Sequence, residues 1–148
     1  MSNIKISFMK KYIFIFAVIG LLTLTSAVYS LDYDDSQIQG LNVTTDIDGA
    51  FNASQTQNKT LAIIFDQDSC VYCDILKENV LSDENVQKEL NENFIVLLVD
   101  INKNPGIAQK YKIYGTPTIQ FLDSNGNDID KIEGCPEKED FLNVIKRI

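Results

Sequence analysis

The chain has 148 residues, of which 45% are hydrophobic and 23% charged. This length and composition are those of one compact domain, which excludes a disordered or a fibrous protein and makes a second domain unexpected. With three cysteines and no histidine, the sequence cannot build a histidine-containing zinc or haem site, a Cys-His protease dyad or a Ser-His-Asp triad.

Residues 1–30 have the pattern of an export leader. Lys5, Lys10 and Lys11 precede an apolar run at 13–24, and small and hydroxylated residues follow it. This order is typical of a signal peptide. The uncharged stretch 12–31 is also about long enough to span a bilayer, for which about 20 residues are needed, so an uncleaved membrane anchor is the alternative. We therefore expect an extracytoplasmic protein, either secreted, held in a periplasm-like space or anchored to the outer face of the cell membrane.

The rest of the chain is strongly acidic. All three leader charges are lysines, which leaves 10 basic and 21 acidic residues and a net charge of −11. Nucleic acid and anionic membrane surfaces would repel such a body, so neither is expected as a partner. Three Asn-x-Ser/Thr triplets, which begin at Asn42, Asn52 and Asn58, are glycosylation acceptors only in a host with the required enzymes.

The leader is followed by a linker at 31–44, which is polar and has no sustained period, and the domain is expected at 45–148. Apolar residues at i, i+3 and i+4 from Ile47 predict a helix, capped by Thr45 or Asp46. The continuous apolar run 61–65 is too short for a helix and suits a strand buried on both faces. We expect this strand to lie at the centre of the sheet.

Further elements alternate along the chain. The pattern predicts a helix from Cys70 to about Val80, a second helix that opens at Ser82-Asp83, a buried strand at 94–99 and a short helix after Asn104-Pro105.

The last third of the domain reads as a hairpin and a closing helix. A strand at 118–122 is followed by an Asn-Gly turn, a strand at 128–133 and a helix that starts at Pro136. The sequence therefore predicts an α/β domain with a four-stranded mixed sheet and helices on both faces.

The motif Cys70-Val71-Tyr72-Cys73 stands where a buried strand gives way, through a short loop, to a helix. The backbone N–H groups and the dipole of a helix start favour a thiolate, so Cys70 is the expected nucleophile. Cys73 lies one turn further on and can attack a mixed disulfide on Cys70. A zinc half-site and an inert disulfide are the alternatives. Zinc would need two more ligands, which this chain lacks histidines to supply, so we expect neither a metal nor a cofactor.

The segment 61–148 resembles a thioredoxin-family domain. The resemblance rests on the Cys70–Cys73 motif after a strand, on the stretches 99–108 and 110–118, and on a glycine after the last strand. More narrowly, residues 82–87 and the leader are similar to secreted thioredoxin-like thiol:disulfide reductases, including the C-terminal domain of the bacterial transmembrane electron conductor. The resemblance implies a thioredoxin fold.

It also implies roles for individual residues. Pro117 is expected to be cis and to face the disulfide, and Thr116 to supply backbone groups that pair with a substrate strand. Together with Val71 and Tyr72 these residues form the expected substrate-binding surface. The expected partners are protein thiol or disulfide substrates and an unidentified redox protein, and the chain is expected to act as a monomer.

Three features depart from the family pattern. Val71-Tyr72 replaces the usual Gly-Pro between the cysteines, so the redox potential of thioredoxin cannot be assigned to this chain. Thioredoxins usually carry a buried Asp six residues before the first cysteine and a Trp directly before it, whereas this chain has Ile64 and Ser69. Asp66, Asp68 or water are candidates to replace the missing proton acceptor, although both carboxylates are equally consistent with solvated loop residues.

The third cysteine, Cys135, precedes the last helix. It is either an accessory thiol near the active disulfide or a small apolar residue packed at a helix cap. For the whole chain two functions stand side by side: an enzyme that exchanges disulfides in exported proteins, with reduction as the expected direction, and a binding module in which the disulfide is permanent.

Overall fold

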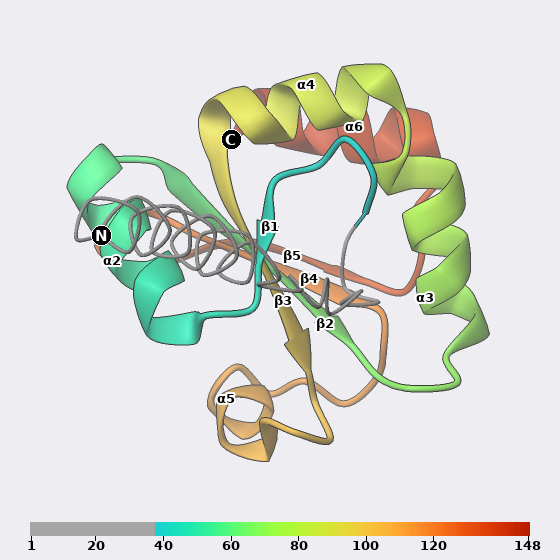
Figure 1. The fold of residues 1–148 in the computed structure, drawn as a ribbon, viewed down its shortest axis with the longest axis horizontal. Helices are drawn as coiled ribbons and strands as arrows, with labels where there is room; N and C mark the ends of the chain where they lie inside the picture. Colours follow the sequence, from blue (N-terminus) through green and yellow to red (C-terminus); the bar gives the residue numbers. More distant parts are fainter. Residues whose placement is uncertain (1–37) are drawn as a thin grey trace, which may run out of the picture. The chain divides into compact units, whose positions relative to one another are not determined.

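Residues 38–148 are described by a computed structural model, in which a mixed sheet lies between two layers of helices. The sheet has five strands in the order β1-β3-β2-β4-β5. Their bounds are β1 Val43–Thr44, β2 Thr60–Asp66, β3 Phe94–Asp100, β4 Thr118–Leu122 and β5 Asp128–Glu133. The central strand β2 pairs parallel with β3 and antiparallel with β4 (Figure 1). The expected central position of this strand is confirmed.

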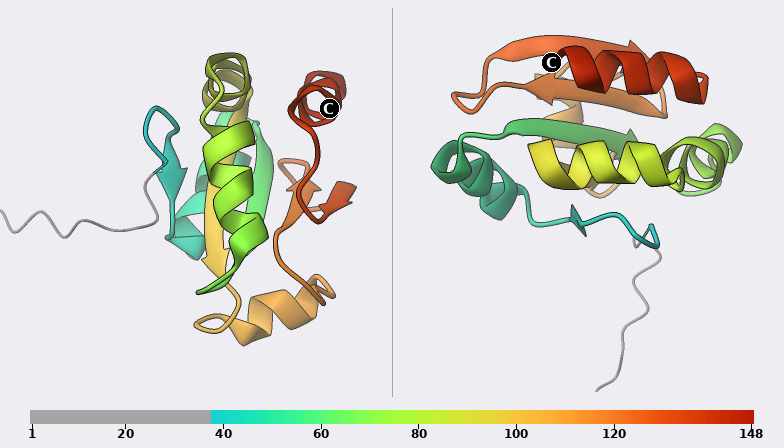
Figure 2. Two further views of the ribbon diagram at one scale, coloured as in Figure 1. Left: turned by 90° about the vertical axis from the view of Figure 1, so that its right-hand side faces the viewer. Right: turned by 90° about the horizontal axis from the view of Figure 1, so that it is seen from above.

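Helices cover both faces of the sheet, as Figures 1 and 2 show. One face carries α3 (Val71–Ile75), the π-helix η2 (Leu76–Leu81), α4 (Glu84–Asn93) and α6 (Lys138–Arg147), and the other carries α2 (Ile47–Gln57) and α5 (Pro105–Lys110). Successive side chains of a strand point to opposite faces. Ile64 therefore packs in the larger core cluster, under η2, α4 and α6, while Ile63 and Phe65 pack in the smaller cluster, on the face of α2 and α5. Both faces of β2 are therefore buried, which explains its continuous apolar sequence.

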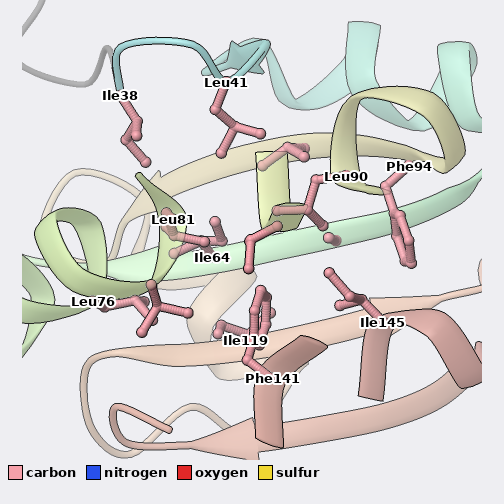
Figure 3. Packing of buried hydrophobic residues seen from close by; sticks show 14 of the residues in the cluster. Ile38, Leu41, Ile64, Leu76, Leu81, Leu90, Phe94, Ile119, Phe141 and Ile145 are labelled. Atoms are coloured by element: carbon pink, nitrogen blue, oxygen red, sulfur yellow. The ribbon is translucent and has the colours of Figure 1, made fainter. Parts of the chain in front are cut away.

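The larger core cluster joins the sheet to α4, η2 and α6. Figure 3 shows Ile64 of β2 and Ile119 of β4 facing Leu76, Leu90 and Phe141 from the helices. All five side chains are at most 2% exposed. This cluster fixes the helix that follows the disulfide against the sheet.

The sheet has one strand more than the sequence predicted. The additional strand β1 has only two residues and pairs with β3 through Val43 and Val96. Residues 38–44, which we assigned to the linker, lie against the domain, with Ile38 and Leu41 buried in the core (Figure 3). Polar side chains of α4 hold their backbone, since Asn91 Nδ2 donates to the Gly40 carbonyl at 2.9 Å and Gln87 Nε2 donates to the Gln39 carbonyl at 2.7 Å.

The helix predicted from Cys70 begins as expected but changes its winding. Residues 71–75 are α-helical and residues 76–81 form the wider π-helix η2. The expected export leader and the membrane-spanning stretch 12–31 lie outside the described residues. Between residues 38 and 148, no helix is long and apolar enough to cross a bilayer.

Candidate active site

Cys70 and Cys73 form a disulfide at the point where β2 passes into α3. The Sγ atoms are 2.12 Å apart and the Cα atoms 5.2 Å apart. Cys70 is the N-cap residue of α3 and Cys73 lies in its first turn. Cys70 is 9% exposed and Cys73 only 1%. The two residues are therefore unequal: Cys70 keeps a small exposed fraction, and Cys73 is almost completely covered.

Three polar groups surround the Cys70 sulfur and carbonyl. The Cys73 N–H donates to Cys70 Sγ at 3.2 Å, and the Thr116 hydroxyl donates to the same sulfur at 3.4 Å. The Asp74 N–H donates to the Cys70 carbonyl at 3.1 Å, which closes the first helical turn. Donors aimed at Sγ favour a thiolate over a thiol at this position once the disulfide is reduced.

The Thr116–Pro117 peptide bond is cis, as the resemblance implied. Strand register explains why this bond lies next to the disulfide. Thr118, the first residue of β4, pairs with Phe65 near the end of β2, so the loop that enters β4 and the loop that leaves β2 meet at one edge of the sheet. The Pro117 carbonyl accepts a hydrogen bond from the Gly134 N–H at 2.8 Å, which ties the same loop to the end of β5.

Exposed apolar side chains gather on these two segments. Among residues 38–148, four large apolar side chains are exposed, and three of them belong to the segments that carry the disulfide and the cis-proline: Val71 at 68%, Tyr72 at 66% and Tyr114 at 90%. Val71 and Tyr72 were expected to contact substrate. Tyr114 was not singled out from the sequence, where its only signal is an aromatic residue in the loop that leads to Thr116-Pro117.

The acidic residues near the disulfide differ in their environment. Asp66 is 9% exposed, and its carboxylate forms an ion pair with Lys77 at 2.5 Å, whereas Asp68 is exposed. Ile64, at the position of the usual buried Asp, pairs in register with Leu98, so that site is apolar on both strands. The structure thus separates the two candidate carboxylates: Asp66 is paired inside the fold and Asp68 is solvated.

A cleft of about 340 Å³ opens beside the disulfide, lined by residues that include Asp66, Ser69, Asp74, Lys77 and Asp100. Burial favours the neutral form of Asp100, but hydrogen bonds from the Asn102 N–H and from Lys103 outweigh it and hold the pKa of this carboxyl below its ordinary value. Within residues 38–148 no three Cys, Asp or Glu side chains converge in a way that could hold a metal ion.

Cys135 stands outside the disulfide as a half-buried free thiol. Its side chain packs against the larger core cluster. Burial raises the pKa of this thiol, and the Glu137 carboxylate adds to the rise. Its chain neighbour Gly134 donates a hydrogen bond to the Pro117 carbonyl, so Cys135 directly follows a residue that contacts the cis-proline loop.

A mixed sheet with helices on both faces, a Cys-x-x-Cys disulfide at a helix start and a cis-proline at the same edge together define a thioredoxin fold. The family model described as a thioredoxin-like domain matches residues 47–148. The chain belongs to this thioredoxin-like family.

Curated relatives carry the same domain within longer chains. The thiol:disulfide interchange protein DsbD of Yersinia pestis (strain Pestoides F) is 32% identical over 95 residues, which cover 60% of this chain and 16% of that protein. DsbD of Haemophilus influenzae (strain PittGG) is 24% identical over 132 residues, which cover 85% of this chain and 22% of that protein. The chain thus spans less than a quarter of the length of these relatives.

Solved structures support the fold. A thioredoxin from Thermus thermophilus aligns with a TM-score of 0.67 at 24% identity, over 73% of this chain and 86% of that chain. A disulphide isomerase from Xylella fastidiosa Temecula1 aligns with a TM-score of 0.62 at 18% identity, over 80% of this chain and 97% of that chain. At these identities the likeness concerns the fold alone.

Proposed function

We propose that the protein is a thiol:disulfide oxidoreductase that acts on exported proteins, with reduction of substrate disulfides as its direction. The observation that carries this proposal is the asymmetry of the Cys70–Cys73 pair. Cys70 is the more exposed of the two, at 9% against 1%, and has two donors on its sulfur. An attacking thiolate must be reachable and stabilised, while a resolving thiol needs to reach only its neighbour.

The proposed reaction moves two electrons. The Cys70 thiolate attacks one sulfur of a substrate disulfide, a mixed disulfide forms and the other substrate sulfur leaves as a thiolate. The Cys73 thiolate then attacks Cys70 Sγ, which restores the internal disulfide and releases the second substrate sulfur. The substrate takes up two electrons and two protons, and a dithiol partner protein must return them to the Cys70–Cys73 pair.

We assign substrate contact to Val71, Tyr72, Thr116 and Pro117, to which the exposed ring of Tyr114 is added. Exposed apolar groups on both sides of the disulfide suit an extended substrate segment, because aromatic anchors dominate binding at such surfaces. Action outside the cytoplasm is supported by the leader pattern at 1–30. Nucleic acid is not expected as a partner of this acidic domain. The chain is proposed to work as a monomer with an unidentified redox partner.

The test is reduction of insulin by the chain in the presence of dithiothreitol. We expect the wild type to accelerate precipitation of the insulin B chain and Cys70→Ser to leave only the background rate. Cys73→Ser that has been reduced, freed of dithiothreitol and then mixed with insulin should accumulate a mixed disulfide, visible by mass spectrometry, because its second step is blocked. Equal rates for wild type and Cys70→Ser would instead support a binding module with a permanent disulfide.

A further inference from the structure

The helix after the disulfide carries a lysine on its inward side. Cys73, Leu76, Lys77 and Val80 recur at i, i+3, i+4 and i+7, the sequence pattern of one face of an α-helix, although residues 76–81 are wound as the π-helix η2. Cys73, Leu76 and Val80 are at most 2% exposed, as expected for a face that packs on the sheet. The Lys77 side chain is 25% exposed, and its ammonium group meets the Asp66 carboxylate at 2.5 Å. A charge thus occupies a position where the pattern calls for an apolar residue.

The partner carboxylate comes from the strand that precedes the disulfide. Asp66 is the last residue of β2, and its side chain is 12% exposed. Because side chains alternate along a strand, Asp66 faces the same side of the sheet as Ile64, toward α3 and η2. Its main chain is fixed as well, since the Ile101 N–H donates to the Asp66 carbonyl at 3.0 Å. The ion pair therefore joins the strand before the disulfide to the helix after it, on the covered side where Cys73 lies.

Fold stability gives little reason for this pair. The cost of desolvating two charges largely offsets their attraction, and an apolar residue of similar volume often serves as well or better. Charge near a sulfur has a direct chemical effect, because a nearby cation favours the thiolate and a nearby anion disfavours it. Lys77 of η2 follows Cys73 of α3 by four residues, about one turn further along the helical segment 71–81.

We propose that Asp66 and Lys77 are positioning residues that set the balance between the dithiol and the disulfide of the Cys70–Cys73 pair. Lys77 stabilises the reduced form through its charge, and Asp66 holds the ammonium in place and partly offsets it. The pair supplies charged groups in a site where Ile64 stands in place of the usual buried carboxylate. This inference rests on the proposed dithiol–disulfide activity.

The experiment measures the equilibrium of the full chain with glutathione. Two glutathione thiols reduce the disulfide to two cysteine thiols and become glutathione disulfide, so two electrons and two protons are transferred. Asp66→Asn leaves Lys77 without its counter-charge and should shift the equilibrium about tenfold toward the dithiol, which corresponds to about 30 mV. Lys77→Met leaves Asp66 unpaired and should shift it about tenfold toward the disulfide. The double variant should lie between the two single variants.

The opposite signs separate this role from a structural one, because damage to the fold would move both variants in the same direction. Any pattern other than opposite shifts overturns the proposal. If Lys77→Met does not fold, Lys77→Gln removes the charge and keeps a donor to Asp66. Arg147→Met removes the cation of the exposed pair with Asp130 and serves as the matched control, with no shift expected. A wild-type disulfide that excess dithiothreitol cannot open would instead contradict the proposed function, because such a pair could not cycle.

Discussion

Tyr114 is an aromatic ring whose exposure the fold does not require. It is 90% exposed and stands two residues before Thr116, whose hydroxyl reaches Cys70. Aromatic side chains that stay exposed beside a reactive group are suited to bind a partner, since burying one in a complex contributes more than burying most other residues.

We therefore expect Tyr114→Ser to lower kcat/KM for insulin about tenfold, equivalent to about 1.4 kcal/mol of transition-state binding. Its free energy of unfolding should change by less than about 0.5 kcal/mol, because the ring supports no core contact. Reaction with glutathione disulfide should be unaffected, since that molecule is too small to need the ring. Ile129→Ser, at another exposed apolar residue, is the control and should leave insulin reduction unchanged.

The thiol of Cys135 should react slowly. Burial, together with the Glu137 carboxylate, raises its pKa, so little thiolate is present at neutral pH. In the reduced protein we expect iodoacetamide to modify Cys70 before Cys135 at pH 7. The Cys135 rate should rise about tenfold per pH unit until its thiolate fraction saturates above the ordinary range of about 8.5. Peptide mass spectrometry over a pH series measures both rates, and faster labelling of Cys135 at pH 7 would show that its thiol is activated.

Among the secondary-structure elements, one ion pair joins the N-terminus of α4 to that of α6. Asp83 caps α4 and lies 3.1 Å from Lys138 at the start of α6. The hydrogen bond from Lys138, helped by the Val86 and Asn85 N–H groups, lowers the pKa of Asp83 despite some opposing desolvation. A carboxyl whose pKa is depressed by folding stabilises the fold above its unfolded pKa of about 3.9 and loses this effect as the pH falls through the folded value.

Asp83→Asn keeps a good helix cap and removes the charge. We expect the variant to be less stable than the wild type at pH 7. The difference should begin to shrink as the pH falls below about 3.9 and should vanish below the lower pKa of the folded protein. Urea unfolding at a series of pH values measures this difference. A difference that stays constant into acid would mean that the charge of Asp83 does not contribute.

Residues 38–44 belong to the folded domain, and Leu41 tests this. Its side chain is 7% exposed in the larger core cluster. Leu41→Ala should lower the free energy of unfolding by about 2 to 3 kcal/mol, the lower part of the range for buried leucines, because this edge of the core can relax. Gln39→Ala, whose side chain is exposed, should change it by less than about 0.5 kcal/mol in the same urea experiment. Equal values for both variants would place these residues outside the cooperative unit.

Elements with their own local pattern could be predicted, and those that depend on distant side chains could not. The continuous apolar run predicted β2, and Asp46 and Asp83 marked two helix starts. In contrast, a two-residue strand has no periodicity to detect, and the burial of Leu41 depends on Gln87 and Asn91 far along the chain. The same holds at the site, where the motif located the disulfide but neither the ion pair of Asp66 nor the exposure of Tyr114.

The whole molecule assembles the site through strand register rather than through long loops. The disulfide follows the end of β2, and the cis-proline precedes the start of β4, which runs antiparallel beside it. A slip of one residue between these strands would turn every side chain of β4 to the opposite face, so burial on both faces enforces the register. The relation between Cys70 and Thr116 is therefore as stable as the core itself.

The direction of electron flow is also a property of the whole fold. Oxidised and reduced forms, each folded and unfolded, make a thermodynamic cycle, so a fold that favours the disulfide more than the unfolded chain does must be more stable when oxidised. The proposed reductase direction requires that the oxidised form be the more stable of the two. We expect the oxidised wild type to unfold at a higher urea concentration than the protein reduced with dithiothreitol. Its free energy of unfolding should be higher by about 1.4 kcal/mol for each 30 mV by which the reduction potential of the folded pair lies below that of the unfolded chain. Cys70→Ser should unfold identically with and without reductant. Greater stability of the reduced form would identify the chain as an oxidant, because a fold that stabilises its dithiol draws electrons from its substrates.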